Sequence, residues 1–312
     1  MQERPSPTAA LSAFLIAMAG LFFFEGFLYL LKSLGVVMGN AVYLLSITFQ
    51  GVIFAVPALV YYRRNPAYTS AMRLRRVDPL CAALIILAAL VGVLALNWVT
   101  VYWTLILRSF GLVTSTGNDA APRTIQQLWL MVAASAIAPA LFEEVLFRGL
   151  LLPSMEPLGE KKAILISGAM FAMLHGRIEA LPAHLMLGVM LAVLVLRTDS
   201  LLSAMLYHVV YNAAIMFLAY MSATSDPASL DALPTLADSV QAIPTVIGLM
   251  GVWLLLVYSA MQRGLKKQKD PLPEAEKKPL PKAALALLVA SAVLLVLVEV
   301  RAVLNMLPGG GA

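Results

Sequence analysis

Three charged residues stand in a stretch of the chain that is otherwise apolar: Glu143, Glu144 and Arg148 within 139–149. On a helix, residues four apart share a face, so Glu144 and Arg148 can form an ion pair. Arg148 stays charged when buried and therefore needs that carboxylate. Glu143 is turned about 100° from Glu144 around the axis and remains free, as a general base would be. The alternative for this stretch alone is a buried ion pair beside a spare, protonated glutamate.

Pro139 precedes Glu143 by four residues. A proline inside a helix removes one backbone donor and leaves the carbonyl four residues earlier, here that of Ser135, without its usual partner. We expect a kink at this point that admits water towards Glu143.

Two further pairs of residues share helix faces at a spacing of four: Phe171 with His175, and His208 with Asn212. A single histidine in a helix is more often a hydrogen-bonded core residue than a catalyst, and a single asparagine usually joins two helices. The predicted depth of these residues in the membrane favours a functional interpretation. At about 1.5 Å per residue, Glu143, His175 and His208 fall in one layer, in the inner half of a hydrocarbon core about 30 Å thick.

The elements that carry these residues are membrane spans. Of the 312 residues, 61% are hydrophobic and only 12% are charged, a composition that excludes a water-soluble globular or a disordered protein. A spanning helix needs about 20 apolar residues, and nine stretches qualify, of which the sixth is short. They are 8–31, 38–62, 80–107, 127–152, 162–181, 183–197, 200–222, 243–262 and 283–306. We predict an all-α, polytopic bundle of about eight to nine transmembrane helices.

The net charge of +5 follows from membrane topology. With the N-terminus in the cytoplasm, most of the 22 basic residues lie on the cytoplasmic side, as the positive-inside rule requires. A nucleic-acid partner is therefore not needed, and we expect an integral protein of a bacterial cell membrane with its N-terminus in the cytoplasm. We divide the chain into N-terminal helices (1–124), a core (125–222) and C-terminal helices (223–312) with a charged cytoplasmic linker at 263–282.

In this order and on membrane helices, the three motifs resemble the CPBP family of CAAX proteases and bacteriocin-processing enzymes, also called Abi, which are polytopic intramembrane endopeptidases. The resemblance covers about 125–222. It implies a glutamate-dependent peptidase, acting on a membrane-associated protein or peptide, and suggests four active residues with three in support. The active residues are Glu143, His175, His208 and Asn212, and the supporting ones are Glu144, Arg148 and Phe171.

The inventory of polar residues excludes other intramembrane peptidase chemistries. Every aspartate falls outside the predicted spans, and no histidine begins a His-Glu-x-x-His motif. Ser203 precedes His208 by five residues and is not clearly placed for a serine mechanism. Zinc remains an alternative, since Glu143, His175 and His208 are an acceptable set with a fourth position for water. We favour a metal-free site, because Asn212 is a poor zinc ligand but a good donor to an oxyanion.

Two other function classes remain open, an ion or proton transporter and a non-catalytic scaffold or immunity protein. The resemblance implies a membrane-associated substrate and leaves open whether it is a prenylated CAAX-type protein or a peptide precursor. His184, which follows Pro182, is expected to have a structural role. Glu25 in the first span is protonated, paired or close to a substrate path, and Gln50 is a further buried amide without an assigned role.

Overall fold

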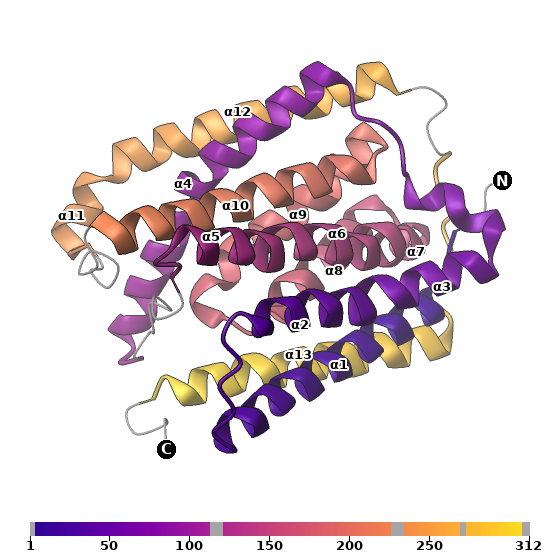
Figure 1. Ribbon diagram of the computed structural model, residues 1–312. Helices are drawn as coiled ribbons and strands as arrows, with labels where there is room; N and C mark the ends of the chain where they lie inside the picture. Colours follow the sequence, from indigo (N-terminus) through magenta and orange to yellow (C-terminus); the bar gives the residue numbers. More distant parts are fainter. Residues whose placement is uncertain (1–3, 113–120, 226–233, 269–272, 308–312) are drawn as a thin grey trace.

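Long, nearly parallel helices form the whole structure, a computed structural model that describes residues 4–112, 121–225, 234–268 and 273–307 (Figure 1). Within these ranges there is no strand, and eight helical segments are long and apolar enough to cross a membrane. The protein is therefore an all-α, polytopic membrane bundle, as predicted. The eight segments are Pro7–Ser33, Ala41–Arg64, Pro79–Ser109, Ile125–Leu158, Ile178–Thr198, Leu201–Ser225, Ile243–Lys267 and Lys282–Asn305.

Two pairs of helices flank the central part of the bundle. On one side α4 (Pro79–Ser109) packs against α12 (Ile243–Lys267), and on the other α1 (Pro7–Ser33) packs against α13 (Lys282–Asn305). The remaining helices lie mostly between these pairs (Figure 1). They are α2 (Ala41–Gln50), α3 (Val56–Arg64), α5 (Ile125–Val132), α6 (Ala138–Leu146), α7 (Leu152–Met155), α8 (Glu160–Leu174), α9 (Leu181–Thr198), α10 (Leu201–Ser225) and the short α11 (Leu236–Gln241).

Three π-helical turns interrupt two of the spans. Gly51–Ala55 joins α2 to α3, Ala133–Ile137 joins α5 to α6, and Phe147–Leu151 joins α6 to α7. Each turn ends two residues before a proline, namely Pro57, Pro139 and Pro153. A proline cannot donate to the carbonyl four residues earlier and crowds it, so the helix widens there instead of continuing its regular ladder. The kink predicted at Pro139 is thus a π-turn in the residues just before it.

The fifth predicted span, 162–181, is shorter than expected. Helix α8 ends at Leu174, Gly176 adopts a positive φ of 56°, and a 3-10 turn at Ile178–Ala180 leads into α9. The predicted span includes this connection, although Arg177 and Glu179 lie within it. The sixth segment, predicted as short, is instead part of a complete candidate span at Ile178–Thr198. Because α8 is too short to count as a span, the described residues contain eight candidate spans, where nine stretches of the sequence qualified.

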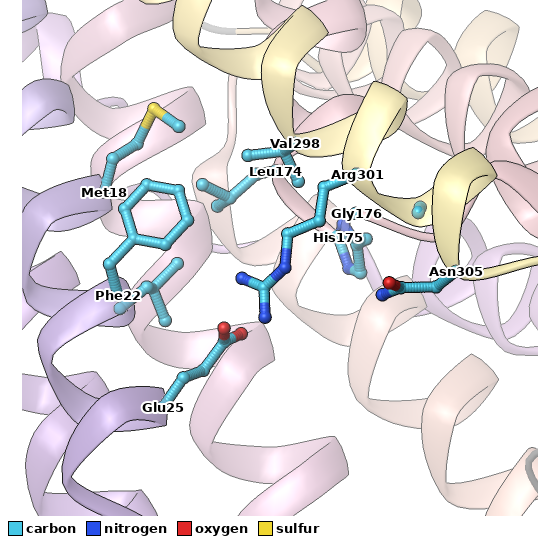
Figure 2. Close-up of a pocket in the computed structure, with 11 residues that line it drawn as sticks. Met18, Phe22, Glu25, Leu174, His175, Gly176, Val298, Arg301 and Asn305 are labelled. Atoms are coloured by element: carbon cyan, nitrogen blue, oxygen red, sulfur yellow. The ribbon is translucent and has the colours of Figure 1, made fainter. Parts of the chain in front are cut away.

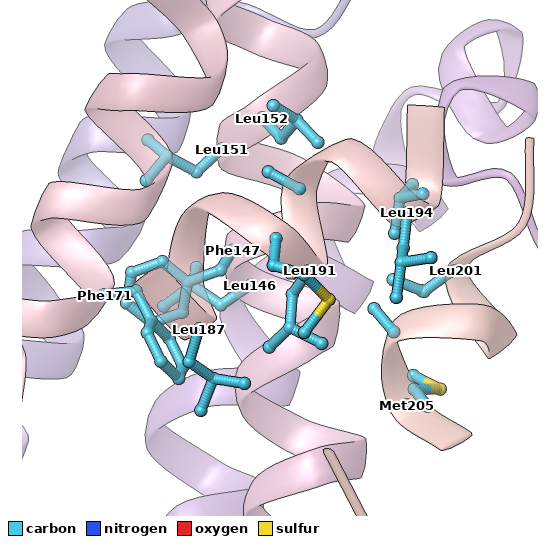
Figure 3. Close-up of a cluster of buried hydrophobic side chains, with 14 of the residues drawn as sticks. Leu146, Phe147, Leu151, Leu152, Phe171, Leu187, Leu191, Leu194, Leu201 and Met205 are labelled. Carbon is cyan, nitrogen blue, oxygen red and sulfur yellow. The ribbon is translucent and has the colours of Figure 1, made fainter. Parts of the chain in front are cut away.

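Helices α8 and α9 approach each other closely through two glycines. A Cβ atom added to Gly168 would lie 2.9 Å from the backbone nitrogen of Val189, and one added to Gly188 would lie 2.8 Å from the carbonyl oxygen of Gly168. Small residues permit such contact between membrane helices. Next to this contact, a buried apolar cluster joins α6, α8 and α9 (Figure 3).

A buried ionic network ties together four segments that are distant in sequence. Glu156, after α7, pairs with Arg4 at 2.6 Å and with Arg73 at 2.7 Å. Asp199, in the turn between α9 and α10, pairs with Arg73 at 3.0 Å and with Arg75 at 2.7 Å. Arg73 and Asp199 both adopt positive φ angles, 53° and 50°, a conformation that is uncommon outside glycine. The network holds the α9–α10 turn, and thereby the start of the helix that carries His208.

Candidate active site

The ion pair predicted between Glu144 and Arg148 is present at the centre of the bundle. Arg148 Nη1 lies 2.9 Å from Glu144 Oε1, and both side chains are completely buried. Arg148 Nη2 also donates to the carbonyl oxygen of Gly188 at 2.8 Å, and its guanidinium lies 4.4 Å from the ring centroid of Phe171. A carboxylate, a carbonyl and an aromatic face therefore compensate the cost of burying this cation.

The two adjacent glutamates have different surroundings. Glu144 Oε1 accepts hydrogen bonds from Arg148 and from His208 Nδ1, the latter at 3.0 Å. Glu143 is also buried, with 9% of its surface exposed, and its carboxylate forms no hydrogen bond among the described residues. The Oε2 atoms of both glutamates lack a partner there, so the difference lies in Oε1 of Glu144, which is held by two fixed groups.

His175 caps the C-terminal end of α8 and turns its ring towards the same region. Its Nδ1 atom lies 2.8 Å from the carbonyl oxygen of Phe171. A carbonyl only accepts hydrogen bonds, so Nδ1 carries the proton and Nε2 of the neutral ring keeps a lone pair. Glu143 and His208 are both electrostatic neighbours of this ring. His175 therefore presents a basic nitrogen in the vicinity of the free glutamate.

The ring of Phe171 is the point at which the three motifs meet. Its centroid lies 4.8 Å from that of His175 and 5.8 Å from that of His208, in both cases edge to face. Phe147, which precedes Arg148, packs against the same ring at 5.4 Å, and Figure 3 shows the two phenylalanines beside Leu187. Phe171 thus separates the two histidines and positions both.

Two amide side chains bind carbonyls that the π-turn before Pro139 leaves available. Asn212 Nδ2, on α10, donates to the carbonyl oxygen of Ser135 at 3.1 Å, and Gln50 Nε2, on α2, donates to that of Ala134 at 3.0 Å. The carbonyl of Ser135 is the one predicted to lose its partner. Sequence reasoning gave Gln50 no role. The sequence did contain one indication of this role: Gln50 is an amide in an apolar span, and the proline of another span leaves a carbonyl that needs a donor.

His184, at the start of α9, stacks on His175 with 4.3 Å between the ring centroids and 26° between the planes. Its Nδ1 atom is buried and has no hydrogen-bond partner among the described residues. The expectation of a structural role did not foresee this contact. The turn at Gly176 brings the two histidines together, and no helical spacing in the sequence relates them.

Within the described residues, no group of three or more His, Cys, Asp or Glu side chains is placed so that it could hold a metal ion. The set Glu143, His175 and His208, named above as possible zinc ligands, is thus not such a group in this structure.

Ser203 lies away from the histidine that would activate it. Its hydroxyl donates to the carbonyl of Ser200 at 2.7 Å and accepts from Thr198 at 2.8 Å, both in the α9–α10 turn. Ser203 therefore serves the turn that begins α10.

Glu25, whose role was left open, lies on α1 and lines a cavity that His175 also lines (Figure 2). The other polar residues of that cavity come from α13, which lies outside the segment that carries the three motifs.

Comparison with protein families gives a match within the segment that carries the three motifs. Residues 125–214 match the family model described as Rce1-like, type II CAAX prenyl endopeptidase. No curated protein and no solved structure gave a significant match. The matched segment runs from α5 into α10 and contains every motif residue, whereas α1, α4, α12 and α13 lie outside it. Residues 125–214 of this membrane protein thus match the Rce1-like family of type II CAAX prenyl endopeptidases, which is consistent with the resemblance to the CPBP family of CAAX proteases.

Proposed function

We propose that the protein is an intramembrane endopeptidase in which Glu143, assisted by His175, activates a water molecule. One observation carries this proposal, the unequal surroundings of the two glutamates. Oε1 of Glu144 is held by Arg148 and His208, whereas the buried carboxylate of Glu143 forms no hydrogen bond among the described residues and neighbours a histidine that presents a lone pair. A buried carboxylate next to a basic nitrogen is suited to general-base catalysis.

The reaction then proceeds as a hydrolysis. Glu143 takes a proton from water, hydrogen-bonded to His175 Nε2, and the hydroxide attacks the scissile carbonyl carbon. The oxyanion that forms accepts hydrogen bonds from His208 and from the second Nδ2 proton of Asn212, and such preorganised donors stabilise it strongly. The C–N bond breaks as Glu143 returns the proton to the leaving amine. Because His208 Nδ1 already bonds to Glu144, donation from Nε2 requires the imidazolium form of His208.

Glu144, Arg148 and Phe171 are positioning residues in this scheme. Glu144 orients His208, Arg148 fixes Glu144 and ties α6 to the carbonyl of Gly188 on α9, and Phe171 sets the distance between the histidines. Rigid support of this kind keeps reacting groups within the narrow geometry that catalysis needs.

The substrate of the proposed reaction is a membrane-associated chain. The description of the matched family names CAAX prenyl endopeptidases, which makes a prenylated CAAX-type protein the first candidate and a peptide precursor the second. No step of the scheme passes through a metal ion. The metal content of purified, active protein and its sensitivity to chelators test that part of the scheme, and activity that tracks bound zinc would contradict it.

The main test is the variant Glu143→Gln, which keeps the size of the side chain and removes the base. We expect cleavage to fall by about 10²–10⁴-fold, the usual worth of a general base, with little change in thermal unfolding. Peptide termini are compared by proteomics in cells that carry wild-type or variant protein. Glu160→Gln, at an exposed glutamate on α8, is the matched control and should cleave normally.

Retained cleavage in Glu143→Gln would contradict the general-base mechanism. If the cellular phenotype persists in the variant while no cleavage product is found in either strain, the protein acts as a scaffold and not as a peptidase.

A further inference from the structure

The ring of His184 lies at the start of α9, against the ring of His175. Among the described residues, this stack is its only aromatic contact, and its buried Nδ1 atom has no hydrogen-bond partner there. A buried polar atom without a partner costs stability, and a leucine at this position would avoid that cost. The reaction scheme gives His184 no role, so it does not explain why a histidine stands here.

The ring of His175 is constrained by two contacts from its own helix. Its Nδ1 atom lies 2.8 Å from the carbonyl oxygen of Phe171, and the ring of Phe171 meets it edge to face at 4.8 Å. A single hydrogen bond fixes the position of one ring atom, but it does not fix the plane of the ring, because the last side-chain torsion of a histidine has broad minima. The direction of Nε2 therefore depends on a further contact that holds this plane.

The stack with His184 is that further contact. The two ring centroids are 4.3 Å apart and the planes differ by 26°. A ring that is stacked on another cannot tilt without losing part of this contact. Because His184 belongs to α9 and Phe171 to α8, the ring of His175 is held from two helices.

The connection between α8 and α9 is itself held by outer helices. Gly176 has a φ of 56°, which glycine adopts readily, and a Cβ atom added to it would lie 2.8 Å from Cγ1 of Val298 on α13. The turn Ile178–Ala180 follows, and Trp103 Nε1 on α4 donates to the carbonyl oxygen of Ile178 at 2.7 Å. Contacts with α13 and α4 thus fix how the two helices meet, and with it the stack of the histidines.

We propose that His184 is a positioning residue, whose stack holds the ring of His175 so that Nε2 stays directed at the water activated by Glu143. The inference rests on the proposed function, in which Nε2 accepts a hydrogen bond from that water. Without the stack the ring turns, the bond from Nδ1 to the carbonyl of Phe171 breaks part of the time, and both neutral tautomers are populated. In the second tautomer Nε2 carries the proton and cannot accept from water.

The first measurement needs no substrate. The chain contains three histidines, so the ¹⁵N shifts of their ring nitrogens can be assigned from single variants of the full-length protein in nanodiscs at slightly alkaline pH. We expect His175 of the wild type in one tautomer, with the proton on Nδ1. His184→Leu removes the ring, keeps an apolar side chain and should give shifts averaged between the tautomers. His184→Phe keeps a ring that stacks and should keep the wild-type shifts of His175.

The second measurement is cleavage, followed through peptide termini as for Glu143→Gln. A displacement of about 1 Å can cost about 10²-fold in rate, so His184→Leu should lower cleavage by about 10–10²-fold. His184→Phe should cleave at close to the wild-type rate. Leu185→Ala, at the next residue of α9, whose side chain is exposed, is the matched control and should change neither the tautomer nor the cleavage.

A mixture of tautomers in the wild type, or a single Nδ1-protonated tautomer in His184→Leu, would overturn the inference. Loss of that tautomer in His184→Phe would also overturn it, because the stack would then not be its cause, and so would wild-type cleavage by His184→Leu. If His184→Leu does not fold, His184→Gln removes the ring in its place and is read in the same way. A tautomer that depends on the stack, in a protein that cleaves no cellular substrate, would contradict the proposed function and leave the support of His175 by His184 standing.

Discussion

Glu143 and Glu144 are adjacent residues of one helix, so their side chains point in directions about 100° apart around the helix axis. This rotation gives the two carboxylates different partners. Oε1 of Glu144 receives Arg148 and His208, whereas the carboxylate of Glu143, which the proposed chemistry uses, forms no hydrogen bond among the described residues. The helical phase alone predicted which glutamate pairs with Arg148. It did not predict that His208 would bond to the same oxygen, because that contact joins helices 64 residues apart.

The variant Arg148→Ala tests how much the buried ion pair of Arg148 with Glu144 contributes to stability. The substitution leaves Glu144 buried and partly uncompensated, and removing one member of a buried pair costs about 3–5 kcal/mol. We expect a large decrease in the unfolding temperature in detergent.

Arg197→Ala is the matched control for that variant. Arg197 pairs with Glu160, but 37% and 46% of these side chains are exposed, and such surface pairs contribute about 0–1 kcal/mol. An equal loss of stability in both variants would show that burial of the Arg148 pair contributes nothing.

At the level of the elements, prolines and glycines shape the site. Pro139 and Pro153 each follow a π-turn, and these two turns bracket the helix that carries both glutamates. Asn212 and Gln50 then bind the carbonyls of the first turn. The proline predicted a break in the ladder. That α2, distant in sequence, supplies one of the two amides is a property of helix packing.

Gly168→Ala tests the contact between α8 and α9. The added methyl group would meet the backbone of Val189 at 2.9 Å, which a side-chain movement cannot relieve. We expect a loss of about 1–3 kcal/mol, the usual cost of overpacking. Activity should also fall, because α8 carries His175 and α9 provides the carbonyl that holds Arg148.

Gly248→Ala is the corresponding control on α12, where nothing lies within 4 Å of the added atom. Because alanine favours the helix over glycine by about 1 kcal/mol, this variant should be as stable as the wild type or more so. Destabilisation of both variants by the same amount would rule out the α8–α9 contact as the cause.

At the level of the whole molecule, α4 and α12 are tied at one end by a bidentate pair. Arg263 donates to both carboxylate oxygens of Asp78, at 2.7 and 3.1 Å, and Asp78 also caps α4 through the amide of Cys81. The hydrogen bonds from Arg263, followed by that from Cys81, hold the pKa of Asp78 below its usual value. The ionised carboxylate is therefore the form that joins the two helices.

Asp78→Asn removes the charge while keeping a residue that caps helices well. Because the folded pKa lies below the unfolded one, about 3.9, the stabilisation is fully present above that value and is lost as the pH falls through the folded pKa. The difference in unfolding temperature between wild type and variant should be positive at pH 7 and shrink below about pH 4. A difference that does not change with pH would contradict a role for the charge.

Helices outside the matched family segment also line the surroundings of the proposed active site. Helix α13 follows a charged linker and lies outside the matched family segment, yet it packs on α1 and α8 and lines the cavity beside His175. Two residues of the linker region contact the core side of the bundle: Lys278 N donates to Pro157 O at 2.9 Å, and Arg4 binds the carbonyl of Pro273 at 2.7 Å.

Composition, helical period and spacing determined the all-α membrane fold, the ion pair of Glu144 with Arg148 and the break before Pro139. These features depend on interactions within one helix or on transfer from water to lipid, both of which are local. Only the tertiary structure decided that His184 stacks on His175, that Gln50 supports the π-turn and that Arg301 and Glu25 face the cavity beside His175. Such contacts join helices whose relative rotation is set by packing, and no periodicity within a single helix encodes that rotation.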